Sequence, residues 1–561
     1  MVNEIKTIKA KFPKGIKYFF VAVALLCFEV NVAQIKERER PQEWQNIVKG
    51  GKFIDLFKPI LPIGDLVRDT WGAQNVIPRY RDNGIEDNDW SYWGGNILLD
   101  KDGQYHMFVC RWREDSPKGH MEWPNSYVVH AVSNNSVGPF KVLETIGKGH
   151  NPEIYQAADG RYVIYVIDGY YISDTLNGPW EYGKFNFESR DRPIIEGLSN
   201  LTFAKREDSS YLMVCRGGGV WFSKDGISGF RQVSNARVYP PVEGRFEDPV
   251  VWRDYVQYHL IVNDWLGRIA FYLRSKDGLH WKVDPGEAYK PGITKYEDGT
   301  NEAWFKYERL KIFQDSLGRA IQANFAVIDT LKFQDLPNDK HSSKNISIPL
   351  TVARQLSILN HKEINANTKE IKVKIVAEKG FDPQNDINIA TLRFGASEEV
   401  NFGRGSKVLS VENSEKDLIL TFNGEGNGFT KDNFAGKLLG KYKNGELLFG
   451  YSRLPWLNYT EPILSTLAPI VTEGSDKISI EIENFGQIRS KKGKLKIEYL
   501  EGKQSTLLGK IITPDLNPFE KKIVHIKSKK SFEKGDKIKL RVSIFIRNSL
   551  NEVFDVEVTV K

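Results

Sequence analysis

The sequence predicts an all-β protein, in which a five-bladed β-propeller is followed by two β-sandwich domains of immunoglobulin-like type. Three observations support this fold class. A short aromatic strand motif recurs about every 50 residues between residues 91 and 350. The chain contains 47 Gly and 24 Pro but only 4 Met, which favours short strands joined by turns. Regular alternation of apolar and polar residues dominates the C-terminal part.

Residues 1–33 have the order of an export signal. Five lysines lie between residues 6 and 17, an apolar run covers residues 18–28, and Asn31-Val32-Ala33 precedes Gln34. The apolar run is too short to cross a bilayer. We therefore predict a signal peptide over residues 1–33, export to the periplasm or the extracellular space, and no membrane span after cleavage.

The repeat defines the propeller. Each copy begins with a polar residue and a tyrosine, continues as an apolar strand, and ends at a serine followed by a turn and an aromatic residue. The motif tyrosines of the four clear copies are Tyr105, Tyr162, Tyr211 and Tyr258. A fifth, weaker copy runs from about residue 299 to residue 322. Units of this length predict propeller blades, and we expect residues 34–90 to close the ring of residues 91–350 with one strand.

Two cysteines remain after removal of the signal. Cys110 and Cys215 occupy equivalent positions in the strand motif of two copies. Equivalent strands of neighbouring blades lie too far apart for a disulfide, whose Cα atoms approach to within about 7 Å. We therefore expect two buried, inert thiols.

The repeat stops after residue 350, and two further domains follow. Residues 351–466 form a Gly-rich region that we expect to be a β domain. In residues 467–561, alternation as at Ile478, Ile480 and Ile482 predicts an immunoglobulin-like sandwich. Neither domain contains a catalytic constellation. We expect spacers, weak carbohydrate binders or contacts through which the chain forms homo-oligomers.

The charge of the chain does not indicate nucleic-acid binding. The formal charge of +7 is carried by residues 1–33 and residues 471–561, and the rest of the chain is close to neutral. Nucleic-acid binding normally requires a dense basic face. We therefore predict no nucleic-acid partner.

Polar residues gather where the inner strand of each blade is expected to begin. These positions converge on the mouth of the central channel, although they lie far apart in the sequence. Carboxylates predominate among them, at Asp87, Asp89, Glu153, Glu247, Asp248 and Glu302. Converging Asp and Glu, without a Ser-His-Asp elbow, a P-loop or a Cys/His cluster, suit acetal hydrolysis by one protonated and one ionised carboxyl group. No metal ligand set and no required cofactor are predicted, although a structural cation in the channel is compatible with the pattern.

Tryptophans flank the same positions. Aromatic faces are common platforms for the apolar faces of sugar rings. The tryptophans concerned are Trp90, Trp93, Trp112, Trp123, Trp265 and Trp304. Their concentration near blade openings favours an oligosaccharide as the partner.

The propeller region resembles exported five-bladed glycosidases, namely the arabinanases and β-xylosidases of glycoside hydrolase family 43 and the anhydro-galactosidases of family 117. The resemblance covers about residues 75–350. It rests on the blade pattern, on Phe246-Glu247-Asp248-Pro249, and on the Gly-Pro turns after Ser133 and Ser173. It implies exo-acting, inverting hydrolysis of a terminal galactose, anhydro-galactose, arabinose or xylose unit of plant or algal oligosaccharides.

The resemblance also implies residue roles. Asp89 would be the general base, Asp248 the carboxylate that tunes or orients it, and Glu302 the general acid. The expected substrate-binding residues are Trp90, Trp93, Asn96, His120, Trp123, His150, Glu153, Glu247, Trp265, Trp304 and Arg309.

Several alternatives remain open at the level of sequence. Asp87 is an alternative base, because Asp89 is followed by Trp90 instead of the proline typical of family 43. Glu153, His120 and His150 are alternative proton donors. The same fold could serve as a non-catalytic carbohydrate-binding propeller, or as a glycoside phosphorylase with a phosphate pocket formed by Arg245, Arg268 and Arg309.

Overall fold

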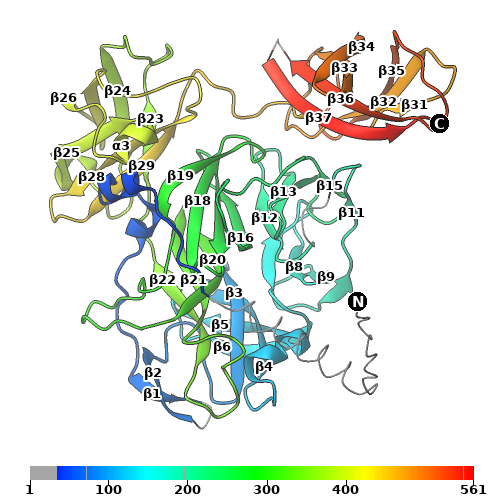
Figure 1. Ribbon diagram of the computed structural model, residues 1–561. Helices are drawn as coiled ribbons and strands as arrows, with labels where there is room; N and C mark the ends of the chain where they lie inside the picture. The colour runs from blue at the N-terminus through cyan, green and yellow to red at the C-terminus, as the bar shows by residue number, and fades with distance from the viewer. Residues whose placement is uncertain (1–34, 71–72, 194–197, 547–548) are drawn as a thin grey trace, which may run out of the picture.

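The computed structural model describes residues 35–70, 73–193, 198–546 and 549–561 (Figure 1). These residues form a five-bladed propeller and two β-sandwiches, which confirms the predicted fold class. The predicted signal peptide lies outside the described residues, so export stays a prediction. No helix in the described ranges is both long and apolar enough to cross a membrane.

Each blade is an antiparallel sheet whose first strand lies nearest the channel. Blade one contains β3 (Trp90–Leu99), β4 (Tyr105–Arg113), β5 (Tyr127–Ser133) and β6 (Lys141–Lys148). Blade two contains β7 (Glu153–Gln156), β8 (Tyr162–Val166), β9 (Gly169–Ser173) and β10 (Glu181–Gly183). Blade three contains β12 (Thr202–Lys205), β13 (Tyr211–Val214), β14 (Val220–Ser223) and β15 (Phe230–Gln232), with β11 (Phe187–Glu188) added in parallel to β15.

Blades four and five complete the ring. Blade four contains β16 (Phe246–Arg253), β17 (Tyr258–Asp264), β18 (Ile269–Ser275) and β19 (Trp281–Glu287). Blade five contains β20 (Lys306–Gln314), β21 (Ala320–Ile328) and β22 (Ser343–Pro349). The strands β17 and β18 are buried along their whole length, because neighbouring elements cover both faces, whereas the outer strand β6 alternates between exposed and half-buried residues.

The segment before β3 joins blade five to blade one. Ile85 pairs with Asn345 of β22, while Gly84 exchanges backbone hydrogen bonds with Val137 and Phe140 of blade one. Gly84 has a φ of 77°, and a Cβ atom there would lie 1.9 Å from the carbonyl oxygen of Asn345. The expected closing strand is therefore reduced to isolated bridges around a residue that must be glycine.

The same N-terminal segment carries three smaller features. Its 3-10 helices η2 (Gln42–Asn46) and η3 (Phe53–Leu56) precede the hairpin of β1 (Leu66–Thr70) and β2 (Ala73–Tyr80). Blade one also contains the 3-10 helix η4 (Gly119–Asn125), between β4 and β5. This helix brings His120 and Trp123 back against the inner strand of blade one.

The first sandwich consists of two sheets that share β23. One sheet has the order β25-β28-β29-β23 and the other the order β23-β24-β27-β26. Its elements are β23 (Arg354–Ile358), β24 (Glu370–Ile375), α2 (Pro383–Asp386), β25 (Ile387–Gly395), α3 (Ser397–Val400), β26 (Val408–Ser414), β27 (Asp417–Asn423), β28 (Ala435–Tyr442) and β29 (Leu447–Arg453).

The second sandwich encloses the alternating isoleucines. In it, β32 pairs with β30, β31 and β35, and the facing sheet has the order β34-β33-β36-β37. Ile478, Ile480 and Ile482 are buried between the sheets. The strands are β30 (Leu464–Thr466), β31 (Ile470–Val471), β32 (Lys477–Asn484), β33 (Lys494–Glu501), β34 (Gln504–Ile512), β35 (Lys521–Lys527), β36 (Lys537–Ile546) and β37 (Ser549–Thr559).

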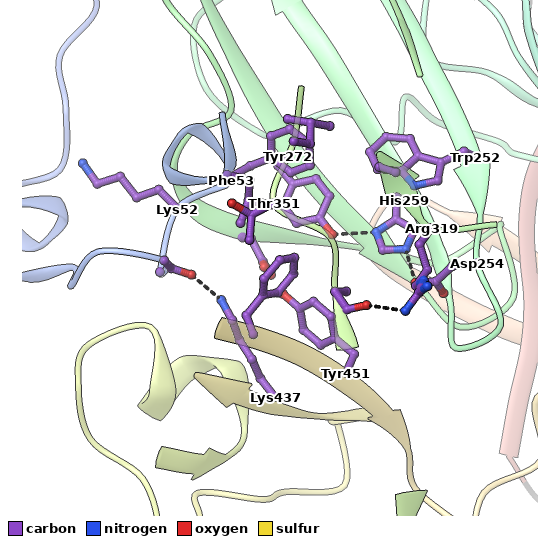
Figure 2. Close-up of a pocket in the computed structure, with 18 residues that line it drawn as sticks. Lys52, Phe53, Trp252, Asp254, His259, Tyr272, Arg319, Thr351, Lys437 and Tyr451 are labelled. Atoms are coloured by element: carbon purple, nitrogen blue, oxygen red, sulfur yellow. Dashed lines mark hydrogen bonds and ion pairs between the residues drawn. The ribbon is translucent and has the colours of Figure 1, made fainter. Parts of the chain in front are cut away.

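The first sandwich joins the propeller across a small polar cavity of about 40 Å³ (Figure 2). His259 contacts the Tyr272 hydroxyl at 2.6 Å through Nδ1 and the Asp254 carboxylate at 3.1 Å through Nε2. On the other wall, Lys437 donates to the carbonyl of Gly50 at 2.9 Å, and burial lowers the pKa of Lys437 to about 8. A cavity of this size holds water but no sugar ring. The cavity therefore lies at the contact between the propeller and the first sandwich.

The second sandwich docks on blade three through buried arginines. Arg192 is fully buried and binds Ser465 and Glu552, with 2.6 Å between its Nη2 atom and the Glu552 carboxylate. Arg206 donates to the carbonyl of Phe485 at 2.8 Å. The docking surface therefore combines the apolar contact of Phe222 with Phe485 and buried cations that must keep their partners.

The two cysteines are free and buried, as expected from the repeat. They occupy β4 and the residue after β13, so they belong to different blades. Burial raises the pKa of Cys110 to about 11, which keeps its thiol protonated and unreactive.

Candidate active site

The five inner strands share one backbone feature at the channel mouth. Each carries, within or just before the strand, one residue in the left-handed conformation with φ between 50° and 60°. These residues are Gly94, Asn151, Asn200, Asp248 and Arg309. In β3, β16 and β20 the pairing register shifts at this point, as in a β-bulge. The bulge re-aims the neighbouring side chains toward the mouth.

The side chains of these residues form the floor of the mouth. The Asn151 amide donates to Asn200 at 3.0 Å, and the Asn200 amide donates to Asp248 at 3.0 Å. Arg309 Nη1 binds the same Asp248 carboxylate at 2.6 Å. Asp248 is therefore a buried, paired carboxylate that links blades three, four and five.

A second layer of polar contacts joins the blades next to this floor. Lys311 forms a buried ion pair with Glu153, and Glu153 also accepts from the Thr202 hydroxyl at 3.0 Å and from the Phe203 backbone at 2.8 Å. Asn96 exchanges hydrogen bonds with the backbone of Ile154, at 2.9 and 3.0 Å. The predicted binding residues Asn96 and Glu153 thus join neighbouring blades. In the described residues no group of three or more His, Cys, Asp or Glu side chains could hold a metal ion, and the Lys311 ammonium lies among these groups.

Two glutamates precede the left-handed residues of blades four and five. The side chain of Glu247 is 22 % exposed, lies 3.6 Å from Arg216 and accepts from Asn200 at 3.2 Å. The side chain of Glu308 is 2 % exposed and pairs with Lys306 at 2.7 Å and also with Lys332. Glu247 therefore faces the mouth, while Glu308 lies beneath two ammonium groups.

The surroundings of Glu247 and Glu308 shift the pKa values of the two carboxyl groups in opposite directions. Burial raises the pKa of Glu247, and the Asp248 and Glu308 carboxylates raise it further, against the opposing effects of Lys332 and Arg216. Burial alone would raise the pKa of Glu308, but Lys306 and Lys332 hold that pKa well below its ordinary value. One carboxyl group therefore keeps its proton to higher pH, while its neighbour stays ionised.

An aromatic wall stands on the side of blade one. His120 packs on Trp93 with ring centroids 4.5 Å apart, and His150 packs on Trp123 at 4.7 Å, with Trp112 between them. Burial lowers the pKa of His120 and of His150 well below the ordinary value. Both histidines are therefore neutral, which argues against either one as the proton donor.

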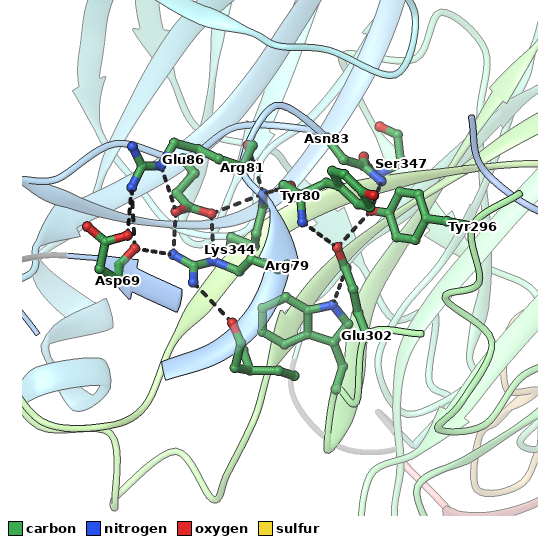
Figure 3. Close-up of polar contacts among 12 residues, drawn as sticks. Asp69, Arg79, Tyr80, Arg81, Asn83, Glu86, Tyr296, Glu302, Lys344 and Ser347 are labelled. Atoms are coloured by element: carbon green, nitrogen blue, oxygen red, sulfur yellow. Dashed lines mark hydrogen bonds and ion pairs between the residues drawn. The ribbon is translucent and has the colours of Figure 1, made fainter. Parts of the chain in front are cut away.

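The structure does not bring the three predicted catalytic carboxylates together. Only Asp248 lies at the mouth. Glu302 is buried in the segment that precedes β20. Its carboxylate accepts hydrogen bonds from the Tyr80 backbone at 2.9 Å, from the Tyr296 hydroxyl at 2.8 Å and from Trp304 Nε1 at 2.8 Å (Figure 3). These donors, with the neighbouring Arg79–Glu86–Lys344 cluster, give Glu302 a packing role. The expectation that Glu302 lies at the start of the inner strand of blade five is wrong, because β20 begins at Lys306.

The two candidate bases lie before β3. The Asp89 side chain is exposed. The Asp87 carboxylate accepts from the backbone of Asp89 and Trp90, at 2.8 and 2.9 Å, and from the Tyr92 hydroxyl. Asp87 therefore orders this turn, and Asp89 remains the accessible carboxylate of the pair.

The remaining predicted residues fall into different places. Trp90 lies under the Arg111 guanidinium at 4.1 Å, Trp304 is 1 % exposed, and Trp265 lies under Lys306 at the mouth. Arg309 is committed to Asp248 and Arg268 lies over Phe305 at 4.5 Å, so these two do not join Arg245 in a phosphate pocket.

Sequence reasoning missed Glu308, Lys306, Lys332 and Arg216. A signal for Glu308 existed, because Glu308-Arg309-Leu310 has the spacing of Glu247-Asp248-Pro249. Lys332 had no signal. It lies in the loop between β21 and β22, and its approach to Glu308 depends on how that loop folds.

Comparisons with known proteins identify distant structural similarity. A mutant of the GH43 protein BlXynB from Bacillus licheniformis matches with 8% sequence identity, over 83% of this chain and 87% of that chain, at a TM-score of 0.31. The unmutated BlXynB matches with 9% identity, over 84% and 77% of the two chains, at a TM-score of 0.21. The periplasmic gluconolactonase PpgL of Pseudomonas aeruginosa matches with 10% identity, over 78% and 100%, at a TM-score of 0.23.

The chain is thus similar to family 43 proteins, as its sequence indicated. No protein-family model and no curated protein matches it. At these identities and TM-scores, the similarity says nothing of activity. The chemistry of the mouth has to be inferred from its own residues.

Proposed function

We propose that this chain is an exported glycoside hydrolase whose catalytic domain is residues 91–350 and whose active site is the channel mouth. The supporting observation is that two glutamates at equivalent positions of adjacent blades have different partners: Glu308 is held by two lysines, whereas Glu247 has one arginine at 3.6 Å, which shifts their pKa values in opposite directions. A protonated carboxyl group beside an ionised one is the arrangement that acetal hydrolysis requires. We keep the expectation of exo-acting, inverting cleavage of an oligosaccharide end.

In the proposed reaction Glu247 is the general acid. Its proton passes to the glycosidic oxygen as the bond from that oxygen to the anomeric carbon breaks. A water molecule attacks the anomeric carbon and gives its proton to Glu308, the general base. Asp248 is a positioning residue. It is held by Arg309 and Asn200, and its negative charge raises the pKa of Glu247.

The test is hydrolysis of plant and red-algal oligosaccharides by the wild type, Glu247→Gln and Glu308→Gln. We expect each substitution to lower kcat by about 10² to 10⁴, because each removes a proton-transfer group. Glu302→Gln and Asp89→Asn are the comparison variants, and they should retain kcat within about threefold of the wild type. The anomer of the first-formed product, followed by NMR, reports inversion.

Four other outcomes have definite meanings. Full activity in Glu247→Gln would contradict the assignment of the proton donor. Loss of activity in Asp89→Asn with retention in Glu308→Gln would restore the base implied by the family resemblance. Turnover that requires inorganic phosphate would indicate a phosphorylase, and saturable sugar binding without turnover would indicate a binding propeller.

A further inference from the structure

Two lysines cover Glu308 in the channel mouth, and each also lies on a tryptophan. Lys306 Nζ is 2.7 Å from one carboxylate oxygen of Glu308 and 4.8 Å from the ring centroid of Trp265. Lys332 pairs with the other oxygen, and its Nζ atom lies 5.1 Å from the ring centroid of Trp93. Glu308 is thus enclosed by two ammonium groups that are braced by aromatic rings from blade one and from the loop after β17.

The charges at the mouth do not balance when Glu247 is protonated. Arg309 is neutralised by Asp248, and Arg38 neutralises the nearby Asp264. Among the described residues of the mouth, Lys306 and Lys332 then share the single carboxylate of Glu308, and Arg216 faces a Glu247 that carries no charge. The proposed reactive state of the enzyme therefore carries excess positive charge at the mouth.

Two cations of this excess are accessible, because the side chain of Arg216 is 36% exposed and that of Lys332 is 31% exposed. Only one of the two, Lys332, also pairs with the proposed base Glu308. The side chain of Lys306 is 8% exposed, whereas Lys332 reaches the mouth from the loop between β21 and β22. Burial alone would lower the pKa of Lys332, but Glu308 and Glu247 raise that pKa above its ordinary value. Lys332 is therefore a charged, partly exposed cation that can exchange Glu308 for another anion.

We propose that the sugar recognised at this mouth carries an anionic substituent, a carboxylate or a sulfate ester, that binds Lys332. This inference rests on the proposed function, because it names the substrate class of the same site. An incoming anion that draws Lys332 toward itself also weakens the pairing of Glu308. Glu308 then has an oxygen free to accept a proton from water, so binding of the correct substrate prepares the base.

The first experiment measures binding without turnover. Galactose, galacturonate, galactose 6-sulfate and inorganic phosphate are titrated into Glu247→Gln, and binding is followed by isothermal titration calorimetry. We expect galacturonate or galactose 6-sulfate to bind at least about tenfold more tightly than galactose, because a charge-assisted hydrogen bond is stronger than a neutral one. Comparison of the two anionic sugars distinguishes the carboxylate from the sulfate ester.

A matched pair of variants assigns the effect to Lys332. Lys332→Met in the same background should abolish the preference for the anionic sugar, whereas Lys340→Met, an exposed lysine of the same loop, should preserve it. Equal affinity for galactose and both anionic sugars, a preference that survives Lys332→Met, or tight binding of phosphate alone would each overturn the proposal.

Kinetics separates this inference from the proposed function. Uronic, sulfated and neutral oligosaccharides are compared as substrates of the wild type and of Lys332→Met. Hydrolysis of neutral substrates as fast as anionic ones would overturn the inference and leave the hydrolase intact. Binding of anionic sugars through Lys332 without hydrolysis of any oligosaccharide would instead overturn the proposed function alone.

Discussion

Glu247 and Glu308 occupy the same bulge position on adjacent blades, yet their partners differ. Glu308 pairs with two lysines, whereas Glu247 has one arginine at 3.6 Å. The number of cations beside each carboxyl group, more than how deeply the group is buried, therefore decides which of the two keeps its proton.

Replacement of Arg216 by methionine tests this control of the acid. Arg216 lowers the pKa of Glu247, so its removal should raise that pKa. The alkaline limb of the kcat/KM profile should then move to higher pH, because Glu247 acts in its protonated form. Arg245→Met, which removes an exposed arginine near the same blade opening, is the control. An alkaline limb that stays in place or moves to lower pH would contradict Glu247 as the acid.

Asp335 provides a second test at the residue scale. It lies in the loop that carries Lys332, faces His120 at 3.7 Å, and has two buried carboxylate oxygens without a hydrogen-bond partner. Burial raises its pKa to about 7, and Asp339 adds to this shift while His341 opposes it. Asp335 in turn adds to the effect of burial in raising the pKa of Glu114, to about 9.

The folded state therefore holds the Asp335 proton more tightly than the unfolded chain does. The resulting cost to stability appears as the pH rises from about 4 to about 7 and is complete above that range. Asp335→Asn should be neutral near pH 4 and stabilising at pH 8, by at most about 4 kcal/mol. Thermal unfolding at both pH values measures this, with Asp102→Asn on an exposed turn as the control. Equal effects at the two pH values would contradict it.

At the scale of elements, the sequence is sufficient where the left-handed residue of a blade has a local signature. Asn151-Pro152 and Asp248-Pro249 each place an Asn or Asp, which tolerates positive φ, before a proline that fixes the next residue. The expected positions of Glu153 and Asp248 at inner strands are confirmed. Blade five has Arg309 at the left-handed position and no proline, so no local signature marks its opening.

Other parts of the site depend on contacts between distant segments. Glu302 has the composition of a mouth residue, but its position is decided by donors from Tyr80 and Tyr296. Lys332 reaches Glu308 only because its loop is anchored on η4, where the His120 backbone donates to Asp335 at 3.0 Å. Neither of these contacts can be predicted from residue spacing in the sequence.

A further prediction concerns Gly84, in the segment that joins blade five to blade one. Gly84→Ala would place a Cβ atom against the Asn345 carbonyl, which is backbone and cannot rotate away. Gly103→Ala is the control, because its φ of 85° imposes the same conformational strain but its Cβ would meet nothing within 4 Å. We expect Gly103→Ala to cost about 1 to 2 kcal/mol of unfolding free energy, and Gly84→Ala substantially more. Equal costs in denaturant unfolding would show that the tie between the blades is dispensable.

At the scale of the whole molecule, a buried ion pair holds the second sandwich on the propeller. Arg192 is fully buried and Glu552 is 8 % exposed, so Arg192→Met leaves a nearly buried carboxylate without its cation. We expect a loss of about 3 to 5 kcal/mol in unfolding free energy. Limited proteolysis should also show faster cleavage near residues 454–463, between the sandwiches.

Arg541→Met provides the matched control for that experiment. Arg541 pairs with Asp555 in the same sandwich, but their side chains are 42% and 37% exposed. A surface pair of this kind contributes at most about 1 kcal/mol. Similar losses in both variants would contradict a role for Arg192 in docking.

The Glu153–Lys311 pair has a consequence for how a polymer could meet this protein. The pair and its hydrogen-bonded neighbours join blades two, three and five across the channel, so we expect them to prevent a glycan chain from passing through the ring. In the proposed reaction only the end of a chain then reaches Glu247, and the released sugar leaves by the route through which the chain entered. The rate per chain end should then be independent of polymer length.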